Sequence, residues 1–330
     1  MKKLFYLIVL ISLQNCSQKK ELTMITQNPH ITAKNIVEEI NKDVKHYNSE
    51  IIYKFRYENF DCNYEVFIND IPCFKQFREA RTASAFEINQ CIFKSGTQKL
   101  TFRMYPAEPD NPTIEKFTED AYLSFQLKSY DKQNKEAEDI VYQKFKTPVI
   151  TSKDQYGNTV EKFIANGKTY YEGSFTFEAT VPYQLQGFDK MQDLRKMDKK
   201  VLEQKLLAKY QEVWQVYNNK QYDDIARISY ENLRDQFIAK YDKKDYINKV
   251  WEMLMEIYKQ PTFEMQPLKD YKLVFFADGK FVALMQTNLD RRVRGNTALW
   301  AKVDYDGGIR PQFCNRYFYI PEGETEFKVY

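Results

Sequence analysis

The feature that most constrains the fold is a change in hydrophobic periodicity near residue 190. Before it, aromatic and β-branched residues recur in short runs such as "EIIYKFRYE", "QKLTFRMYP" and "AYLSFQLKSYD", with polar turns between them. After it, apolar residues recur at three- and four-residue spacing, first from Leu202 to Tyr217. A period of two predicts strands, whereas a period near 3.6 predicts helices. We therefore expect an α+β protein of two domains.

Residues 35–188 are predicted to form the first domain. About eight short strands separated by turn residues are typical of a β-sandwich or jelly roll. Asn69-Asp70 and Asn166-Gly167 predict tight hairpin turns, because Asn, Asp and Gly adopt positive φ at little cost. A short helix is expected just before the first strand, where apolar residues from Ile36 to Val44 follow helical spacing.

Residues 189–330 are predicted to form the second domain, with three helices followed by an antiparallel sheet. Asp198 is suited to cap the first helix, and Pro261 is suited to end the third. Strands then return, with a hairpin at Asp278-Gly279. The apolar positions at helical spacing run from Leu202 to Tyr217, from Ile225 to Phe237 and from Ile247 to Tyr258.

Charge and composition exclude several classes of function. A net charge of +3 gives no electrostatic basis for binding nucleic acid. Only 10 Gly are present, and the sequence contains no P-loop, no GxSxG and no HExxH, so we expect no cofactor and no metal. The two histidines, His30 and His46, precede the first strand. A non-enzymatic role is favoured, although 46 acidic residues leave a carboxylate-based hydrolase open.

The first residues have the order of a secretory signal. Lys2 and Lys3 precede an apolar run from Leu4 to Leu13, which fits the about 7–15 residues of a signal and is too short to span a bilayer. Leu13-Gln14-Asn15-Cys16 then resembles a bacterial lipobox, in the permissive form of Bacteroidetes-like bacteria.

This resemblance implies a lipoprotein. Residues 1–15 would be a signal peptide that is removed, and Cys16 would carry diacylglycerol on its thiol and an acyl chain, such as palmitate, on its amine. Residues 16–34 would then be a lipidated cysteine and a tether. Ser17 after the cysteine implies the outer membrane, on its periplasmic or its surface face.

Two further resemblances concern the domains. "VFINDIPCF" followed by "FEINQCIFKSGTQKLTFRMYP" resembles a segment of galactose-binding-like β-sandwiches. Three helices before a run of strands are similar in order to the NTF2-like fold. The first resemblance implies a jelly-roll-like module, and the second implies a cone-shaped sheet covered by helices.

The sharpest basic cluster is "DRRVRGN", which contains Arg291, Arg292 and Arg294. In an extended segment Arg292 and Arg294 share one face and could bind a carboxylate or phosphate. The alternative is a solvated loop or an edge strand whose charges prevent pairing with another strand. Trp300, on a predicted strand, is a candidate for stacking on a ligand.

With Cys16 carrying lipid, Cys62, Cys73 and Cys91 are candidates for one local disulfide, because the envelope outside the inner membrane permits disulfides. Small buried hydrophobic residues are the other interpretation of these cysteines.

The sequence therefore predicts a cell-envelope lipoprotein that contacts the membrane through Cys16. Its expected role is non-catalytic binding of a protein partner, as in immunity or assembly. A glycan-binding lipoprotein and a carboxylate-based hydrolase remain alternatives.

Overall fold

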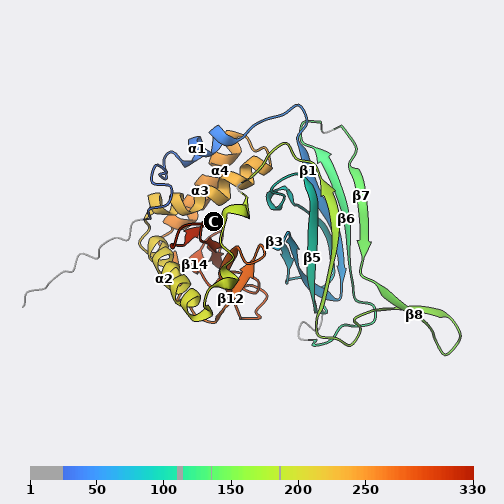
Figure 1. Ribbon diagram of the computed structural model, residues 1–330. Coiled ribbons are helices and arrows are strands. Elements are labelled where there is room, and N and C mark those ends of the chain that lie inside the picture. Colours follow the sequence, from blue (N-terminus) through green and yellow to red (C-terminus); the bar gives the residue numbers. More distant parts are fainter. Residues whose placement is uncertain (1–24, 110–113, 135, 186) are drawn as a thin grey trace, which may run out of the picture.

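A computed structural model (Figure 1) describes residues 25–109, 114–134, 136–185 and 187–330. The predicted signal peptide and Cys16 lie outside the described residues. The protein is α+β, as predicted, with most strands before residue 180 and the three long helices after it. None of the described helices is long and apolar enough to cross a membrane. We call residues 50–185 the strand half, and residues 25–46 with 190–330 the helix half.

Two four-stranded antiparallel sheets form the strand half, in the orders β4-β1-β6-β7 and β10-β5-β2-β3. Their facing sides are aromatic: the ring of Phe55 lies 5.6 Å from that of Phe177, and the ring of Phe102 lies 5.8 Å from that of Phe125. Each pair joins one sheet to the other, so a shared apolar core holds them together. The strands are β1 (Ile51–Phe60), β2 (Cys62–Ile68), β3 (Ile71–Gln76), β4 (Thr82–Glu87), β5 (Gly96–Pro106), β6 (Tyr122–Asp131), β7 (Ile140–Lys146) and β10 (Tyr171–Ala179).

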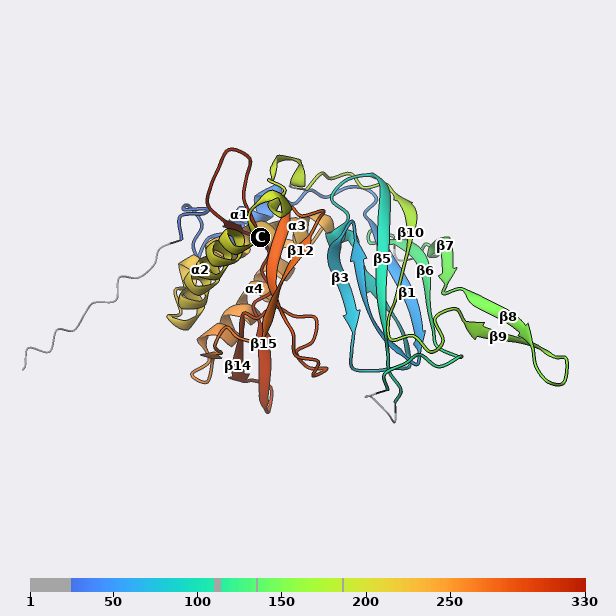
Figure 2. The same cartoon turned by 60° about the horizontal axis from the view of Figure 1, so that its bottom comes forward.

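A separate two-stranded hairpin, β8 (Val149–Lys153) with β9 (Thr159–Phe163), projects from this half (Figure 2). The prediction of a hairpin at Asn166-Gly167 is wrong, because the flanking strands β9 and β10 do not pair with each other. β9 pairs with β8, and β10 pairs with β5. Asn69-Asp70 does join a hairpin, that of β2 and β3, and both residues have positive φ.

The helix half contains α2 (Lys199–Asn218), α3 (Tyr222–Ala239) and α4 (Lys244–Lys259), as predicted. Asp198 caps α2, since its carboxylate accepts hydrogen bonds from the backbone of Lys200 and Val201 at 3.0 Å each. Two small sheets complete this half, in the orders β11-β14-β15 and β12-β13-β16-β17. Their strands are β11 (Glu264–Met265), β12 (Tyr271–Phe276), β13 (Phe281–Gln286), β14 (Trp300–Asp304), β15 (Ile309–Phe313), β16 (Phe318–Tyr319) and β17 (Lys328–Val329).

The N-terminal segment belongs to the helix half. The predicted short helix exists as α1 (Ile36–Asp43), but it packs against α3 and α4 rather than on the sheets of the strand half. The tether predicted to extend to residue 34 is packed from Ile25 onward: Ile25 and Ile31 are buried, and the Ile25 amide donates to the Asp224 carboxylate. Burial of these apolar side chains outweighs the polar character of the residues between them.

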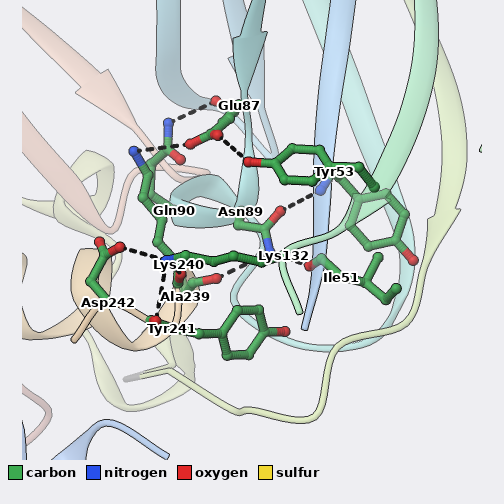
Figure 3. A network of polar contacts seen from close by, with 11 residues as sticks. Ile51, Tyr53, Glu87, Asn89, Gln90, Lys132, Ala239, Lys240, Tyr241 and Asp242 are labelled. Carbon is green, nitrogen blue, oxygen red and sulfur yellow. Dashed lines mark hydrogen bonds and ion pairs between the residues drawn. The ribbon is translucent and has the colours of Figure 1, made fainter. Parts of the chain in front are cut away.

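A polar network joins the two halves at the end of α3 (Figure 3). The Asn89 side chain accepts from the Tyr53 amide and donates to the carbonyls of Ile51 and Ala239. Lys132 donates to the Lys240 carbonyl at 2.6 Å. The last carbonyls of a helix lack partners within it and attract a cation, so these contacts fix the helix end against the strand half.

This network also explains why "FEINQCIF" is not one strand. Strand β4 ends at Glu87, and Asn89–Cys91 form a short 3₁₀ helix, η1. The side-chain amide of Asn89 is hydrogen-bonded to the Tyr53 amide and the Ile51 carbonyl. A continuing β4 would need these two backbone groups as its own partners.

Candidate functional site

A cleft of about 620 Å³ lies between the two halves, where β3 faces β12 (Figure 2). Its volume is within the usual range for small-molecule sites, about 300–1,000 Å³. One end is closed by contacts between two hairpins, since the rings of Phe67 and Phe276 stack and the Ala277 amide donates to the Asp70 carbonyl. The charged and polar residues that line the cleft include Glu65, Lys75, Arg103, Tyr105, Lys272, Gln286, Arg294 and Asn315.

Lys75 projects from β3 into this lining, and its ammonium is held by the opposite half. The nitrogen donates to the Gly295 carbonyl and to Oδ1 of Asn296, each at 2.5 Å. Within the described residues no carboxylate lies within 4 Å of it. Burial lowers the Lys75 pKa to about 8, and the nearby charge of Glu65 only partly opposes this.

Arg294 packs against two neighbouring aromatic rings. Its guanidinium lies 4.4 Å from the ring centre of Phe77 and 4.1 Å from that of Tyr105. Such stacking stabilises a cation and fixes its orientation. The Tyr105 hydroxyl donates to the Glu65 carboxylate at 2.8 Å, and burial raises the Tyr105 pKa.

Gly295 lets the loop of Arg294 approach β3 this closely. Its φ is +70°, and a Cβ atom there would lie 2.9 Å from the Phe77 ring and 3.0 Å from Cδ of Lys75. Only glycine both adopts this backbone conformation readily and leaves room for the Lys75 side chain.

Charged side chains alternate in sign across the sheet that forms one wall. Glu65 on β2 pairs with Lys75 on β3 and with Arg103 on β5, and Arg103 in turn pairs with Glu172 on β10. The last two form an ion pair at 2.9 Å. Apolar side chains complete the lining: Val66, Phe67, Pro72, Phe74, Val274, Phe276, Met285, Leu289 and Tyr317.

The predicted arginine cluster lies at the edge of this cleft. The segment is a turn, with the amides of Val293 and Arg294 both bonded to the Asp290 carbonyl, so the expectation of an extended segment is wrong. The exposed Arg292 pairs with Asp290 at 2.7 Å. Arg294 lines both the cleft and a neighbouring hollow of about 750 Å³. Arg291 and Arg292 also line that hollow.

The structure places Trp300 on β14, apart from the lining of the cleft. It is partly buried, and its ring lies 6.1 Å from that of Phe313. A role in stacking on a ligand stays a prediction.

The described cysteines, Cys62, Cys73, Cys91 and Cys314, are free thiols. Cys62 donates to the Tyr122 carbonyl at 3.3 Å. Cys73, at the floor of the cleft, is in hydrogen-bonding contact with Cys91, and burial raises the Cys73 pKa. Among the described residues no group of three or more His, Cys, Asp or Glu side chains could hold a metal ion.

Sequence reasoning missed Glu65, Lys75 and Tyr105. Glu65 and Tyr105 follow buried residues on strands with alternating burial, whereas every residue of β3 after Ile71 is partly buried. The sequence pattern does not show that the helix half covers this face.

Comparisons with known proteins return no relative. No family model matches this chain, and no curated protein or solved structure matches it either. Its function is therefore inferred from its own residues and geometry.

Proposed function

We propose that this chain is a non-catalytic binding protein of the cell envelope and that its ligand occupies the cleft between the two halves. The observation that carries the proposal is the built cleft itself. Residues of both halves line it, and the Asn89 and Lys132 contacts hold the halves in one arrangement. A preformed site of this kind binds without a large ordering cost.

The residues of the cleft favour binding over hydrolysis. Glycoside hydrolysis uses two carboxyl groups about 5–10 Å apart. Glu65 is the only carboxylate among the described lining residues, and it accepts a hydrogen bond from Tyr105. Neither His30 nor His46 is among those residues.

The interior of the helix half also supports a non-catalytic role. Its centre is filled by side chains that are fully buried, among them Tyr210, Tyr217 and Phe318. Arg316 is buried there as well and donates to the hydroxyls of Tyr217 and Ser229. We assign this half to an NTF2-like arrangement with a packed interior, and the strand half to a jelly-roll-like β-sandwich, supported by the aromatic contacts between its sheets.

Attachment to the outer membrane through a lipidated Cys16 is part of the proposal, and the lipobox-like sequence supports it. Eight residues lie between Cys16 and the packed Ile25. Such a segment reaches at most about 30 Å when extended, so a lipid on Cys16 would keep the helix half close to the bilayer.

A protein partner is the second candidate ligand, and strand β7 favours it. β7 is at the edge of its sheet, and its side chains Ile140, Val141 and Tyr142 are exposed. Edge strands can add a strand from another chain. Loss of a co-purifying protein from a Val141→Lys variant would support this candidate.

The cleft is tested with the full chain, purified from envelopes without unfolding and examined by native mass spectrometry. Val274→Trp fills the cleft, and Val149→Trp on the exposed hairpin is the matched control. We expect a bound small molecule on the parent chain and on the control, and none on Val274→Trp. An unchanged bound molecule on a folded Val274→Trp would contradict the assignment of the cleft.

A further inference from the structure

We infer that the cleft binds an amphiphilic organic anion, with its carboxylate or phosphate group on Lys75 and Arg294 and its apolar body against Phe67, Val274 and Met285. This inference rests on the proposed function, because it names the class of ligand for the same cleft. The shared chemistry is a compact oxyanion attached to an apolar chain or ring.

The charges that line the cleft do not balance. Four cations, those of Lys75, Arg103, Lys272 and Arg294, face a single carboxylate. Arg103 has Glu172 as an ion-pair partner, and Lys272 is exposed to water. The half-buried cations that remain without a carboxylate are therefore Lys75 and Arg294.

These two cations lie at the same end of the cleft. Lys75 donates to the carbonyl of Gly295, the residue that follows Arg294. An ammonium has three N–H donors, and the described contacts use two of them, so one donor is left for a ligand. The Arg294 guanidinium, which lies against the rings of Phe77 and Tyr105, carries further N–H donors.

This geometry suits an oxyanion better than a neutral polar group. A guanidinium can bind two oxygens of a carboxylate or phosphate in parallel. Because stacking already fixes the Arg294 side chain, little rotational freedom is lost when the ligand binds. A buried ammonium without a counterion is costly, and an anionic ligand offsets this cost.

The apolar part of the lining explains why an inorganic anion is not the expected ligand. Phe67 of the strand half stacks on Phe276 of the helix half with ring centres 6.4 Å apart, and the two rings form an apolar wall of the cleft. Val274 and Met285 extend this wall from the helix half. Removing such surface from water favours the binding of a ligand with an apolar body.

Proton uptake should accompany binding of the anion. Burial lowers the Lys75 pKa to about 8 in the free protein, and an anion beside the ammonium would raise it. At pH 8.5 the free site is therefore mainly neutral, and the bound site is protonated. The charged and titratable groups that share the cleft with Lys75 are Glu65, Cys73, Arg103, Tyr105, Lys272, Arg294 and Tyr317.

The experiment uses the full chain and four soluble probes: octanoate, octyl phosphate, octanol and inorganic phosphate. Calorimetric titration is carried out at low salt, with the amphiphiles below their critical micelle concentrations. We expect octanoate or octyl phosphate to bind at least tenfold more tightly than octanol and inorganic phosphate. The better of the two anions distinguishes a carboxylate ligand from a phosphate ligand.

Variants locate the anion. Lys75→Met is expected to weaken anion binding at least tenfold without weakening octanol binding. Lys168→Met, on an exposed loop residue, removes the same charge and is the control. Titrations at pH 8.5 in two buffers of different ionisation enthalpy should show proton uptake in the parent chain and none in Lys75→Met. Arg294→Gln tests the second cation if Lys75→Met fails to fold.

The outcomes separate this inference from the proposed function. Equal affinity for octanol and the two anions, anion binding unchanged by both variants, or no binding of any probe would overturn the anion assignment. If Val274→Trp then still abolishes binding of the co-purified molecule, the cleft is a site for another class of ligand. If Val274→Trp changes nothing, the proposed cleft itself is wrong.

Discussion

Lys75 and Glu65 are direct partners across strands β3 and β2, yet the Lys75 ammonium binds a carbonyl and an amide oxygen of the helix half instead of the Glu65 carboxylate. Glu65 in turn accepts the hydroxyl of Tyr105. A cation that could have been neutralised within its own sheet is thus left available inside the cleft.

Lys75 predicts a specific dependence of stability on pH. Its pKa falls from 10.5 to about 8 on folding, so between these values the unfolded chain binds more protons than the folded one. The free energy of unfolding should therefore rise with pH from about 8 to 9.5. Urea denaturation across this range should show the rise in the parent chain and a flatter profile in Lys75→Met, and equal slopes would contradict the prediction.

Asp235 predicts the opposite trend at acid pH. Burial raises its pKa from 3.8 to about 6, although Arg234 and Tyr330 oppose the shift. The folded state then binds more protons than the unfolded state between these values, so this contribution to stability is lost as pH rises from about 4 to 6. Asp235→Asn, which keeps an acceptor for Tyr330, should remove up to roughly 3 kcal/mol of this dependence. Thermal melts from pH 4 to 7 measure it.

Asn89→Ala should destabilise the protein by about 2–4 kcal/mol, because it leaves the Tyr53 amide and two carbonyls without their partner. Asn134→Ala, at an exposed position, serves as the control. Hydrogen exchange should report faster exchange at Tyr53 in Asn89→Ala. Exchange as slow as in the parent chain would show that the network does not hold the two halves.

Gly295→Ala and Gly323→Ala form a matched pair. Both glycines have positive φ, of +70° and +79°, but only at Gly295 would a Cβ meet other atoms. Gly323→Ala should cost about 1 kcal/mol through the backbone alone. Gly295→Ala should cost about 1–3 kcal/mol more and should also weaken ligand binding, because Lys75 must move. Equal losses of unfolding free energy in urea denaturation would show that the loop accommodates the added methyl group without further cost.

Cys73 and Cys91 are the pair expected to form a disulfide under oxidation, since their thiols are in contact. Exchange with glutathione disulfide would oxidise the two thiols and reduce the glutathione. Mass spectrometry of tryptic peptides should then find Cys73 linked to Cys91, and Cys91→Ser should abolish the link. A link from Cys62 to either residue would contradict the contact.

Local patterns in the sequence predicted local structure well. Asp198 marked the start of α2, and Asn69-Asp70 marked the turn between β2 and β3, because each signal acts on its own backbone. The same reasoning failed at Asn166-Gly167, where pairing with distant strands decides the connection. It also failed to place α1, whose apolar face fits the helices that follow much later in the chain.

The cleft could be predicted only in part. Arg294 stood out in a cluster of arginines, but its contact with the rings of Phe77 and Tyr105 depends on three separate segments. Glu65 and Lys75 look like ordinary outward residues of two strands, and only the docking of the helix half turns that face into a lining.

Because Ile25 packs on α3, a lipid on Cys16 would lie close to one end of the molecule and far from the other. The chain enters the fold on the helix half, while the β8–β9 hairpin projects from the opposite side (Figure 1). In a lipid-anchored molecule the hairpin and the edge of β7 would face away from the bilayer. A soluble partner would meet these strands first, whereas an amphiphile arriving from the membrane would approach from the helix half.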